Sequence, residues 1–448
     1  MKLLYIHQYF STREGSLGTR SYEFAKYLVG QGHQVTMITG DSSLASNSPE
    51  RQSRFYSFYS IDGIDIIAVK NHYSNYMGYF RRVLSFLQFV FFSCLKGLAL
   101  KEYDVVLATS TPLTVAIPAL LIKVWNKIPF TFEVRDLWPE APRQIGAIRS
   151  RLLIGLLKGL ERKTYQQAEH IIALSPGMLQ GVIDEGISPR KVTMIPNCCD
   201  LDLFGPEIAG RAELREQYQL QGKLVVLHGG SMGIANGLDY LIHAAIKLQE
   251  QSRDDIVFVL AGDGKTRPLL EAMCAQHGLG NVIFTGPLPR KKMPALFAAA
   301  DVTITSFQNL PILATNSPNK FFDSLAAGKP VIVNSAGWTK QLVEEYQVGF
   351  YVDPADPGQL ADLLLRLQSG IWDLAEMGRR ARRLAEEKYE RIQLARQVEA
   401  VLLAACEQGK GGWQPDEGAK GDYSGGGAGN AVSSGHEGAA QGNAAHSR

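Results

Sequence analysis

The stretch "KLVVLHGGSMGIANG" (223–237) runs from an unbroken apolar segment into a turn that contains Gly229, Gly230 and Gly233. An apolar run without alternation is typical of a strand buried on both faces, as in a parallel sheet. Glycines directly after such a strand let the next helix N-terminus approach a phosphate closely. The stretch therefore predicts a strand–turn–helix unit of a doubly wound α/β domain.

The same unit recurs along both halves of the chain. Strands that alternate with helices form parallel sheets that are covered on both faces. We therefore expect two Rossmann-like domains with doubly wound parallel sheets, facing each other across a cleft. The predicted strands are "KLLYIHQYF", "QVTMITG", "IDIIAV", "YDVVLATS", "PFTFEV", "HIIALS" and "KVTMIP", and then "KLVVLHGG", "DIVFVLAG", "NVIFTG", "DVTITSF", "KPVIVNS" and "GFYVD".

Length and composition indicate where the domains divide. The 448 residues are more than one hydrophobic core accommodates, and 45% hydrophobic with 20% charged residues describe a globular protein. The turn-rich segment "NCCDLDLFGPEIAG" (197–210) is the expected linker, which gives domains over 1–205 and 206–388 and a final helix over 389–408. Residues 409–448 are rich in Gly, Ala and Ser, so we expect a disordered tail there.

Charge and cysteine usage exclude several classes of protein. A net charge of +2 does not indicate a nucleic-acid binder, and none is expected as a partner. The five cysteines have no metal-ligand or redox spacing, which favours a reducing, cytoplasmic setting. The N-terminus is interpreted as a first strand, because no small-residue cleavage site follows its short apolar run.

Three turns offer glycines and polar groups to a phosphate-bearing ligand. Such turns are also common without a ligand, so tight turns with solvated basic side chains remain the alternative. The first turn is "STREGSLGTRSYEF", the second lies in the opening stretch, and the third is "LAGDGKTRPLLEA". Their candidate donor-binding residues are Gly15, Ser16, Gly18 and Arg20, then Gly230, Ser231 and Gly233, then Gly262, Asp263, Gly264 and Arg267.

The segment "TNSPNKFFDSLAAGKPV" places a cation where a helix disfavours one. Ser317 is predicted as the N-cap and Pro318 as the first helical residue, so Lys320 falls in the first turn. The helix dipole disfavours a cation there unless an anion binds beside it. One turn later, Asp323 can accept hydrogen bonds from sugar hydroxyls. The alternative is a surface lysine without a role.

Two charged motifs stand outside the glycine turns. In "FEVRDLWPEAP" (132–142), Arg135 and Asp136 follow a buried strand, where the pair either ties down the loop or binds a phosphate. The "DLD" motif (200–202) resembles a short acidic metal motif, but it lies in the linker, and we expect no metal site.

Two stretches combine apolar and basic residues. "VLSFLQFVFFSCLKGLAL" (83–100) follows Arg81 and Arg82, and is predicted either as a helix in the core or as one lying in a membrane interface. "PRQIGAIRSRLLIGLLKGLERK" (142–163) has six basic residues and one acid, Glu161. A surface over 81–100 and 142–163 suits an anionic membrane, although charge runs are usually solvated faces.

With these motifs in place, residues 1–405 resemble retaining glycosyltransferases of family 4, which have the GT-B fold. "RDLWPE" and "SPNKFFDSLAAGKPV" resemble in particular the subgroup of the fucosamine transferase WbuB of O-antigen and capsule synthesis. The resemblance to the family also rests on the stretches "GTRSYEFAKYLVGQGHQVTMITG", "AEHIIALSPGM", "KVTMIPNCCDLDLF", "VLAGDGKTRPLLE" and "VIFTGPLPRKKMPALFAAADVTI".

The resemblance implies roles for the candidate residues. The turn at Gly15 would close over the donor diphosphate, and Leu288 would lie at the edge of the base beside Gly262–Gly264. Asp323 would bind the ribose hydroxyls, while Asn319 and Lys320 would meet the sugar and diphosphate. The helix over 389–408 would cross back to the first domain.

Three departures from the family pattern concern the site. Thr315 and Asp323 stand where many relatives have two glutamates, and no arginine or lysine follows the second glycine turn. Arg135 replaces a histidine; since a guanidinium is a poor proton acceptor, it is expected to hold an anion, and Asp136 to orient it or contact the acceptor. The predicted catalytic residues are therefore Arg135, Asp136 and Lys320.

The predicted function is transfer, with retention, of a sugar from a UDP-sugar donor to a lipid-linked or polysaccharide acceptor. An N-acetylated sugar and a lipid-diphosphate-linked saccharide acceptor are expected. This transfer belongs to cell-surface polysaccharide synthesis, needs no cofactor and no obligatory metal, and takes place on the cytoplasmic side of the inner membrane. A UDP-sugar 2-epimerase of similar fold is one alternative. A non-catalytic subunit of a polysaccharide-assembly complex is another.

Overall fold

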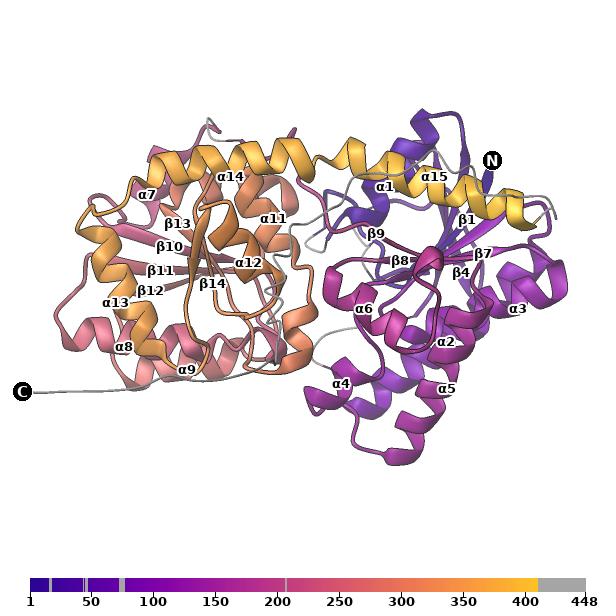
Figure 1. The fold of residues 1–448 in the computed structure, drawn as a ribbon, viewed down its shortest axis with the longest axis horizontal. Helices are drawn as coiled ribbons and strands as arrows, with labels where there is room; N and C mark the ends of the chain where they lie inside the picture. Colours follow the sequence, from indigo (N-terminus) through magenta and orange to yellow (C-terminus); the bar gives the residue numbers. More distant parts are fainter. Residues whose placement is uncertain (16–17, 43, 45–46, 72–76, 206–207, 410–448) are drawn as a thin grey trace, which may run out of the picture. The chain divides into compact units, whose positions relative to one another are not determined.

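The computed structural model describes residues 1–409 except 16–17, 43, 45–46, 72–76 and 206–207 (Figure 1). Two parallel sheets with helices on both faces form its framework, one in each half of the described chain. This confirms the predicted α/β class with two doubly wound domains. The predicted tail lies outside the described residues from residue 410 onward.

The first sheet has nine strands in the order β3-β4-β5-β2-β1-β6-β7-β8-β9. Seven of them are parallel and coincide with the seven predicted runs: β1 (Lys2–Ile6), β2 (Gln34–Gly40), β5 (Ile64–Val69), β6 (Val105–Thr109), β7 (Phe130–Val134), β8 (His170–Ala173) and β9 (Val192–Met194). The other two, β3 (Arg51–Gln52) and β4 (Tyr56–Ile61), are antiparallel and were not predicted.

Helices cover both faces of the first sheet. On one face α1 (Arg20–Gly30) packs beside α15 (Arg391–Gly409), and on the other lie α2 (Tyr79–Ala99) and α3 (Ala116–Asn126). The remaining helices of this domain are α4 (Glu140–Gln144), α5 (Arg151–Gln167) and α6 (Pro176–Asp184), with short 3₁₀ turns η1 (Leu113–Val115) and η2 (Pro189–Lys191).

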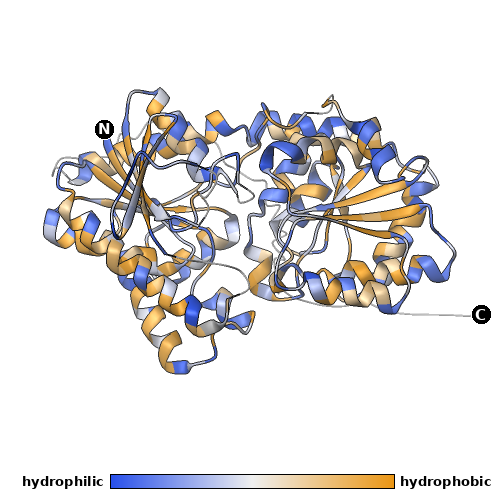
Figure 2. Cartoon of the chain, turned by 180° about the vertical axis from the view of Figure 1, so that it is seen from behind, coloured by the Kyte–Doolittle hydropathy of each residue, from blue (hydrophilic) through white to orange (hydrophobic). Residues whose placement is uncertain are grey.

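The second sheet has six parallel strands in the order β12-β11-β10-β13-β14-β15, and all six were predicted. Their bounds are β10 (Leu224–Gly229), β11 (Ile256–Ala261), β12 (Val282–Gly286), β13 (Val302–Thr305), β14 (Val331–Val333) and β15 (Gly349–Tyr351). Alternate residues of β10 enter opposite cores: Val225 and Leu227 pack into one, Leu224 and Val226 into the other. Burial on both faces explains the unbroken apolar run, which Figure 2 shows as orange strands.

The helices of the second domain lie on both sides of this sheet (Figure 1). They are α7 (Arg211–Gln217), α8 (Asp239–Glu250), α9 (Arg267–Gln276), α10 (Met293–Ala299), α11 (Asn319–Ala326), α12 (Trp338–Glu345), α13 (Pro357–Gln368) and α14 (Leu374–Lys388). Three 3₁₀ turns complete it: η3 (Ile234–Asn236), η4 (Arg290–Lys292) and η5 (Pro311–Thr315).

The chain returns to the first domain after α14. Helix α15 packs on α1 and against β6 and β7, and buries Leu394, Val398 and Leu402 in the first-domain core. The return crosses beside the linker, where the Cys199 N–H donates to the Tyr389 carbonyl at 2.7 Å. Both connections between the domains therefore lie together.

Helix α2 presents an apolar face outward. Among the described residues it is the one helix long and apolar enough to cross a membrane by length and composition, with 28% of the window Phe80–Ala99 buried. That low value argues against the interpretation of this stretch as a core helix. Its exposed side chains recur at spacings of three and four residues: Phe80, Leu84, Leu87, Phe91 and Leu95.

Candidate active site

Helix α11 brings a lysine to the second glycine turn. The helix begins at Asn319, with Pro318 as its N-cap residue. The prediction of Ser317 as a side-chain cap is wrong, because the Ser317 hydroxyl instead accepts the N–H of Asn197 at 3.2 Å. Lys320 is thus the second residue of the helix, among the backbone N–H groups that no carbonyl of the helix accepts.

Lys320 has no carboxylate partner within the described residues. Its Nζ donates to Oδ1 of Asn236 and lies 5.4 Å from the centre of the Phe307 ring. Its stem passes Gly230, where an added Cβ would stand 3.5 Å from the lysine Cε. Desolvation lowers the pKa of Lys320 to about 7. A desolvated cation paired only with an amide and a ring is suited to an incoming anion.

The second and third glycine turns pack backbone on backbone. A Cβ at Gly262 would stand 1.9 Å from the Gly230 carbonyl oxygen, and one at Gly264 would stand 2.6 Å from that of Met232. Both glycines also have positive φ, 140° and 157°. The glycines thus bring the two turns together. Beside them, Arg267 is paired with Glu271 at 2.7 Å and lies 3.9 Å from Asp263. These two carboxylates already partly neutralise its charge.

The first glycine turn meets residues of both domains. An added Cβ at Gly18 would stand 2.5 Å from Nδ2 of Asn319 and 4.0 Å from Nη2 of Arg135. The missing side chain therefore lets Arg135 of the first domain and Asn319 of the second approach one another. Gly15 accepts the backbone N–H of Arg290 at 3.2 Å, while Ser16 lies outside the described residues.

The guanidinium of Arg135 lies beside a buried histidine. Its Nη1 approaches Nε2 of His7 at 3.5 Å, and Nδ1 of His7 lies 2.8 Å from the Ser21 hydroxyl. Burial, and then the Arg135 charge, hold the pKa of His7 well below its usual range. A neutral His7 that accepts from Arg135 at Nε2 orients the guanidinium without adding a second positive charge.

Asp136 is the half-buried carboxylate beside Arg135. Its Oδ2 accepts the Thr111 hydroxyl at 2.6 Å. Burial raises the pKa of Asp136, against the opposing effects of Thr111 and Arg135. A raised pKa makes this carboxylate a better proton acceptor than an ordinary aspartate, so it can serve as a base or contact a hydroxyl.

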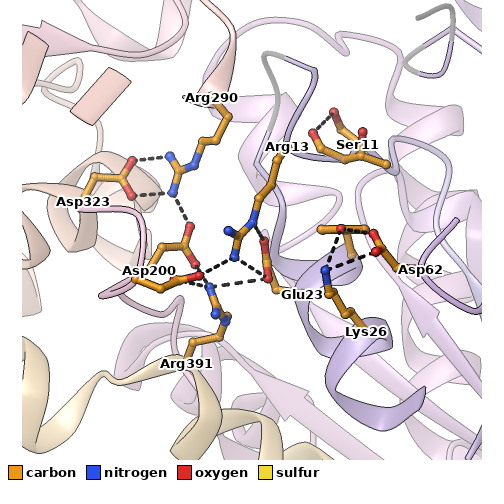
Figure 3. Close-up of polar contacts among 12 residues, drawn as sticks. Ser11, Arg13, Glu23, Lys26, Asp62, Asp200, Arg290, Asp323 and Arg391 are labelled. Carbon is orange, nitrogen blue, oxygen red and sulfur yellow. Dashed lines mark hydrogen bonds and ion pairs between the residues drawn. The ribbon is translucent and has the colours of Figure 1, made fainter. Parts of the chain in front are cut away.

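Asp323 lies in an ion pair that the sequence did not reveal. Both of its oxygens accept from Arg290, at 2.6 and 2.7 Å, and Arg290 also donates to Asp200 at 2.7 Å (Figure 3). Burial raises the pKa of Asp323 while Arg290 opposes this effect. Arg290 therefore sets the position of the Asp323 carboxylate. Nothing in the pattern "TGPLPRKK" indicated that partner.

The linker carboxylates are also bound by arginines. Asp200 accepts from Arg290 and, at 2.9 Å, from Arg391, which also donates to Asp202 at 2.9 Å. The "DLD" motif resembles a short metal motif. In this structure both of its carboxylates form ion pairs with arginines.

Arg20 was predicted at the first glycine turn, and the structure places its side chain elsewhere. It is buried, donates to Glu133 at 2.9 Å and to the carbonyls of Ile195 and Pro196. Its guanidinium is therefore occupied by a buried ion pair and backbone groups, which removes it from the donor-binding candidates. The prediction rested only on the position of Arg20 in the first turn of a helix that follows a glycine turn.

Two further predicted positions are used for packing. The Thr315 carbonyl accepts the hydroxyl of Ser175, and an added Cβ at Gly177 would stand 2.9 Å from Cβ of Thr315, so this segment rests on α6 of the first domain. Leu288 is half-buried against the second-domain core.

The segment that follows Asp136 joins the two domains. Leu137, Ala141 and Ile145 form an apolar cluster with Ile312 and Leu313 of the second domain. The charges of "FEVRDLWPEAP" therefore stand at the edge of an interdomain contact, next to Asn319 and Gly18.

Comparison with known families agrees with this arrangement. Residues 17–203 match the family described as Glycosyltransferase Family 4, and residues 210–384 match the one described as Glycosyl transferases group 1. Together the two matches cover most of the described residues, one in each domain. The chain is therefore built from a family 4 domain followed by a group 1 glycosyltransferase domain.

Curated relatives match over part of their length. Alpha-D-kanosaminyltransferase of Streptomyces kanamyceticus is 30% identical over 162 residues, which is 36% of this chain and 40% of that protein. The putative colanic acid biosynthesis glycosyl transferase WcaI of Escherichia coli is 26% identical over 195 residues, 43% of this chain and 47% of that one. The matched part thus spans about half the length of these relatives or less.

Solved structures match over nearly the whole chain. HepE of Anabaena in complex with UDP-glucose has a TM-score of 0.67 at 19% identity and covers 90% of this chain and 100% of that one. WaaG, a glycosyltransferase involved in lipopolysaccharide biosynthesis, has a TM-score of 0.64 at 17% identity, covering 92% and 100%. At these identities the likeness establishes the fold, which is that of the GT-B glycosyltransferases.

Proposed function

We propose that this protein transfers a sugar from a UDP-sugar to a lipid-diphosphate-linked saccharide, with retention of the anomeric configuration. The observation that carries the proposal is Lys320, a desolvated cation at the start of α11 with no carboxylate partner in the described chain. A leaving diphosphate needs charge neutralisation in the transition state, and a lysine beside free helix N–H groups supplies it. HepE, of similar fold, binds UDP-glucose.

The donor would lie between the two domains. Lys320 and the N–H groups of α11 would hold the diphosphate, and Asn319 would reach the donor sugar near Gly18. Asp323 would accept the ribose hydroxyls, and Leu288 would border the base near Gly262–Gly264. This arrangement includes no obligatory metal ion and no cofactor.

The reacting hydroxyl of the acceptor would approach from the first domain. Arg135, oriented by His7, would hold an acceptor or donor phosphate bidentately. Asp136, whose pKa is raised by burial, would accept the proton of the attacking hydroxyl or orient it. The bond from the anomeric carbon to the diphosphate breaks as the bond to the acceptor oxygen forms on the same face.

Transfer is tested by offering UDP-sugars one at a time with membrane lipid extract. The expected result is a product whose mass exceeds the acceptor's by one sugar residue, with an N-acetylated donor preferred, and its loss in an Arg135→Lys variant that folds normally. Release of UDP without a saccharide product, or a changed UDP-sugar, would instead support the epimerase. No turnover with any UDP-sugar would refute the transferase.

The second part of the proposal is a membrane-facing surface on the first domain. Besides the apolar face of α2, Leu152 and Leu156 of α5 are 76% and 65% exposed. Arg149 and Arg151, just before them, make no ion pair within the described chain. An apolar face flanked by unpaired cations suits an anionic bilayer, here the cytoplasmic face of the inner membrane, where a lipid-linked acceptor resides.

Replacing Leu87 and Phe91 by glutamate is expected to weaken binding to vesicles that contain phosphatidylglycerol by at least about tenfold, since each buried side chain contributes about 1.5–3 kcal/mol. Vesicle sedimentation measures this. The matched control is Ile371→Glu, an equally exposed apolar residue (63%) in the second domain, which should bind as the wild type does. Unchanged sedimentation of the α2 variant would rule this surface out.

The family description does not distinguish subgroups. The likeness to the fucosamine transferase subgroup, and a place in O-antigen, capsule or exopolysaccharide synthesis, are part of the proposal and rest on "RDLWPE" and "SPNKFFDSLAAGKPV". WcaI is described as a colanic acid enzyme and WaaG as a lipopolysaccharide enzyme, which supports a cell-surface polysaccharide as the product.

A further inference from the structure

Seven charged side chains form one connected set of ion pairs where the linker meets both domains and α15 (Figure 3). We call this set, together with one backbone hydrogen bond described below, the ionic circuit. It contains three arginines and four carboxylates, Arg13, Arg290, Arg391, Glu23, Asp200, Asp202 and Asp323.

The circuit begins at Arg13, on the loop that leads to Gly15. Its Nε donates to Glu23 of α1 at 2.5 Å, and its Nη2 donates to Asp202 of the linker at 2.9 Å. Glu23 is almost completely buried, while the Arg13 side chain is 30% exposed. Arg13 therefore fixes its loop to a rigid helix and to the linker at once.

The middle of the circuit is Arg391, the first residue of α15. Its Nη1 lies 2.9 Å from both Asp200 and Asp202, and 3.4 Å from Glu23. This guanidinium is shared by three carboxylates, and so it joins the first domain to both acids of the linker.

The circuit closes at Arg290. Its side chain binds Asp200 and Asp323, and its backbone N–H donates to the carbonyl of Gly15 at 3.2 Å. Gly15 is two residues after Arg13. The path that leaves the loop at Arg13 therefore returns to it at Gly15 through Arg290, which also binds the carboxylate proposed for the ribose.

We propose that Arg13 is a positioning residue of the donor site, which holds the turn that ends at Gly15 in place through the ionic circuit. This inference rests on the proposed function, in which the donor sugar lies near Gly18, just after that turn. A glycine-rich loop loses more conformational entropy on ordering than other segments, so it needs external ties. Arg13 supplies a partly buried tie, the Arg290 backbone supplies a second, and the exposed pair of Glu14 with Lys291 supplies a third. The "DLD" carboxylates are the hub that couples the first two.

Arg13→Gln and Asp202→Asn, singly and combined, test the inference. The expected result in the protein without donor is faster hydrogen exchange at the amide of Gly15, which donates to the Thr12 carbonyl at 3.1 Å. UDP is expected to bind about tenfold more weakly. Both residues act through one circuit. The double variant should therefore lose no more UDP affinity than the single variant that binds UDP more weakly.

The matched control is Lys26→Met. Lys26 lies one turn after Glu23 on α1 and pairs with Asp62 at 3.3 Å, with side chains 49% and 40% exposed, but this pair does not reach the loop. It should leave loop exchange and UDP affinity unchanged.

Wild-type exchange at Gly15 in Arg13→Gln would overturn the inference. So would a lowered melting temperature with normal loop exchange and UDP affinity, because Arg13 would then only stabilise the fold. A wild-type protein that binds no UDP would refute the proposed donor, whereas the exchange measurement without donor would still decide the role of Arg13.

Discussion

Lys320→Met is expected to lower kcat/KM for the UDP-sugar by about 10²–10³, the range for removing one preorganised group that stabilises developing negative charge. Methionine keeps the apolar stem that passes Gly230 and lies by Phe307, so the fold should persist. Steady-state kinetics and UDP titration of the purified variant measure the effect. Lys292→Met, which removes an exposed lysine of the same domain, should retain wild-type kinetics.

The same lysine predicts a pH dependence of donor binding. In the free protein, desolvation lowers the pKa of Lys320 to about 7, and a bound diphosphate would raise it again. Below pH 7 the lysine is already charged and binding takes up no proton. Above pH 7 the lysine is neutral, so binding of the diphosphate takes up close to one proton. The affinity for the diphosphate therefore falls by up to about tenfold for each unit that the pH rises.

Calorimetry in buffers of different ionisation enthalpy measures that uptake. The uptake should rise between pH 6 and pH 8 in the wild type and be absent in Lys320→Met. Equal uptake in both proteins would assign the proton to another group, and normal kinetics in the variant would remove Lys320 from the proposed mechanism.

Arg290→Met is expected to destabilise the protein by about 3–5 kcal/mol, because removing one partner of a buried ion pair leaves an uncompensated charge. Asp323 is 4% and Asp200 3% exposed, and Asp323 would lose both of its hydrogen-bond donors. Urea denaturation should show the loss in the transition of the second domain.

Two comparisons isolate the cause. Lys291→Met removes an exposed pair with Glu14, 57% and 53% exposed, and should cost no more than about 1 kcal/mol. Adding Asp323→Leu to Arg290→Met should recover part of the stability, since a buried pair replaced by apolar side chains no longer strands a charge. A double variant less stable than Arg290→Met would show that the pair is not the source.

The parallel strands could be predicted because burial on both faces of a strand requires a run of apolar residues, which is visible in the sequence. All thirteen of them are short apolar runs in the sequence. The antiparallel strand β4 was missed although a turn signal follows it: "YSFYSI" leads directly into Asp62 and Gly63. Both have positive φ, 51° and 77°, as a two-residue hairpin requires.

The candidate site could be predicted only in part. Lys320 and Gly18 could be predicted as candidates because a cation in a first helical turn, or a glycine after a strand, has a local reason. Asn319 was predicted from the resemblance, and the structure brings it to Gly18. Ion pairs have no such local mark: Arg290 and Asp323 are 33 residues apart, and Arg391 and Asp200 are 191 apart. Arg20 shows the opposite error, since its local position suggested a phosphate while Glu133, distant in sequence, binds it.

The return of the chain through α15 makes the first domain discontinuous in sequence. A fragment that ends at residue 205 would lack the helix that covers α1, β6 and β7, and would expose the apolar surface that Leu394, Val398, Val401 and Leu402 now bury. Separate production of the two halves therefore requires residues 391–409 to be supplied with the first half, either as a fused segment or as a peptide in trans. Joining them directly after the linker would keep the order of the chain and give a first domain that includes its covering helix.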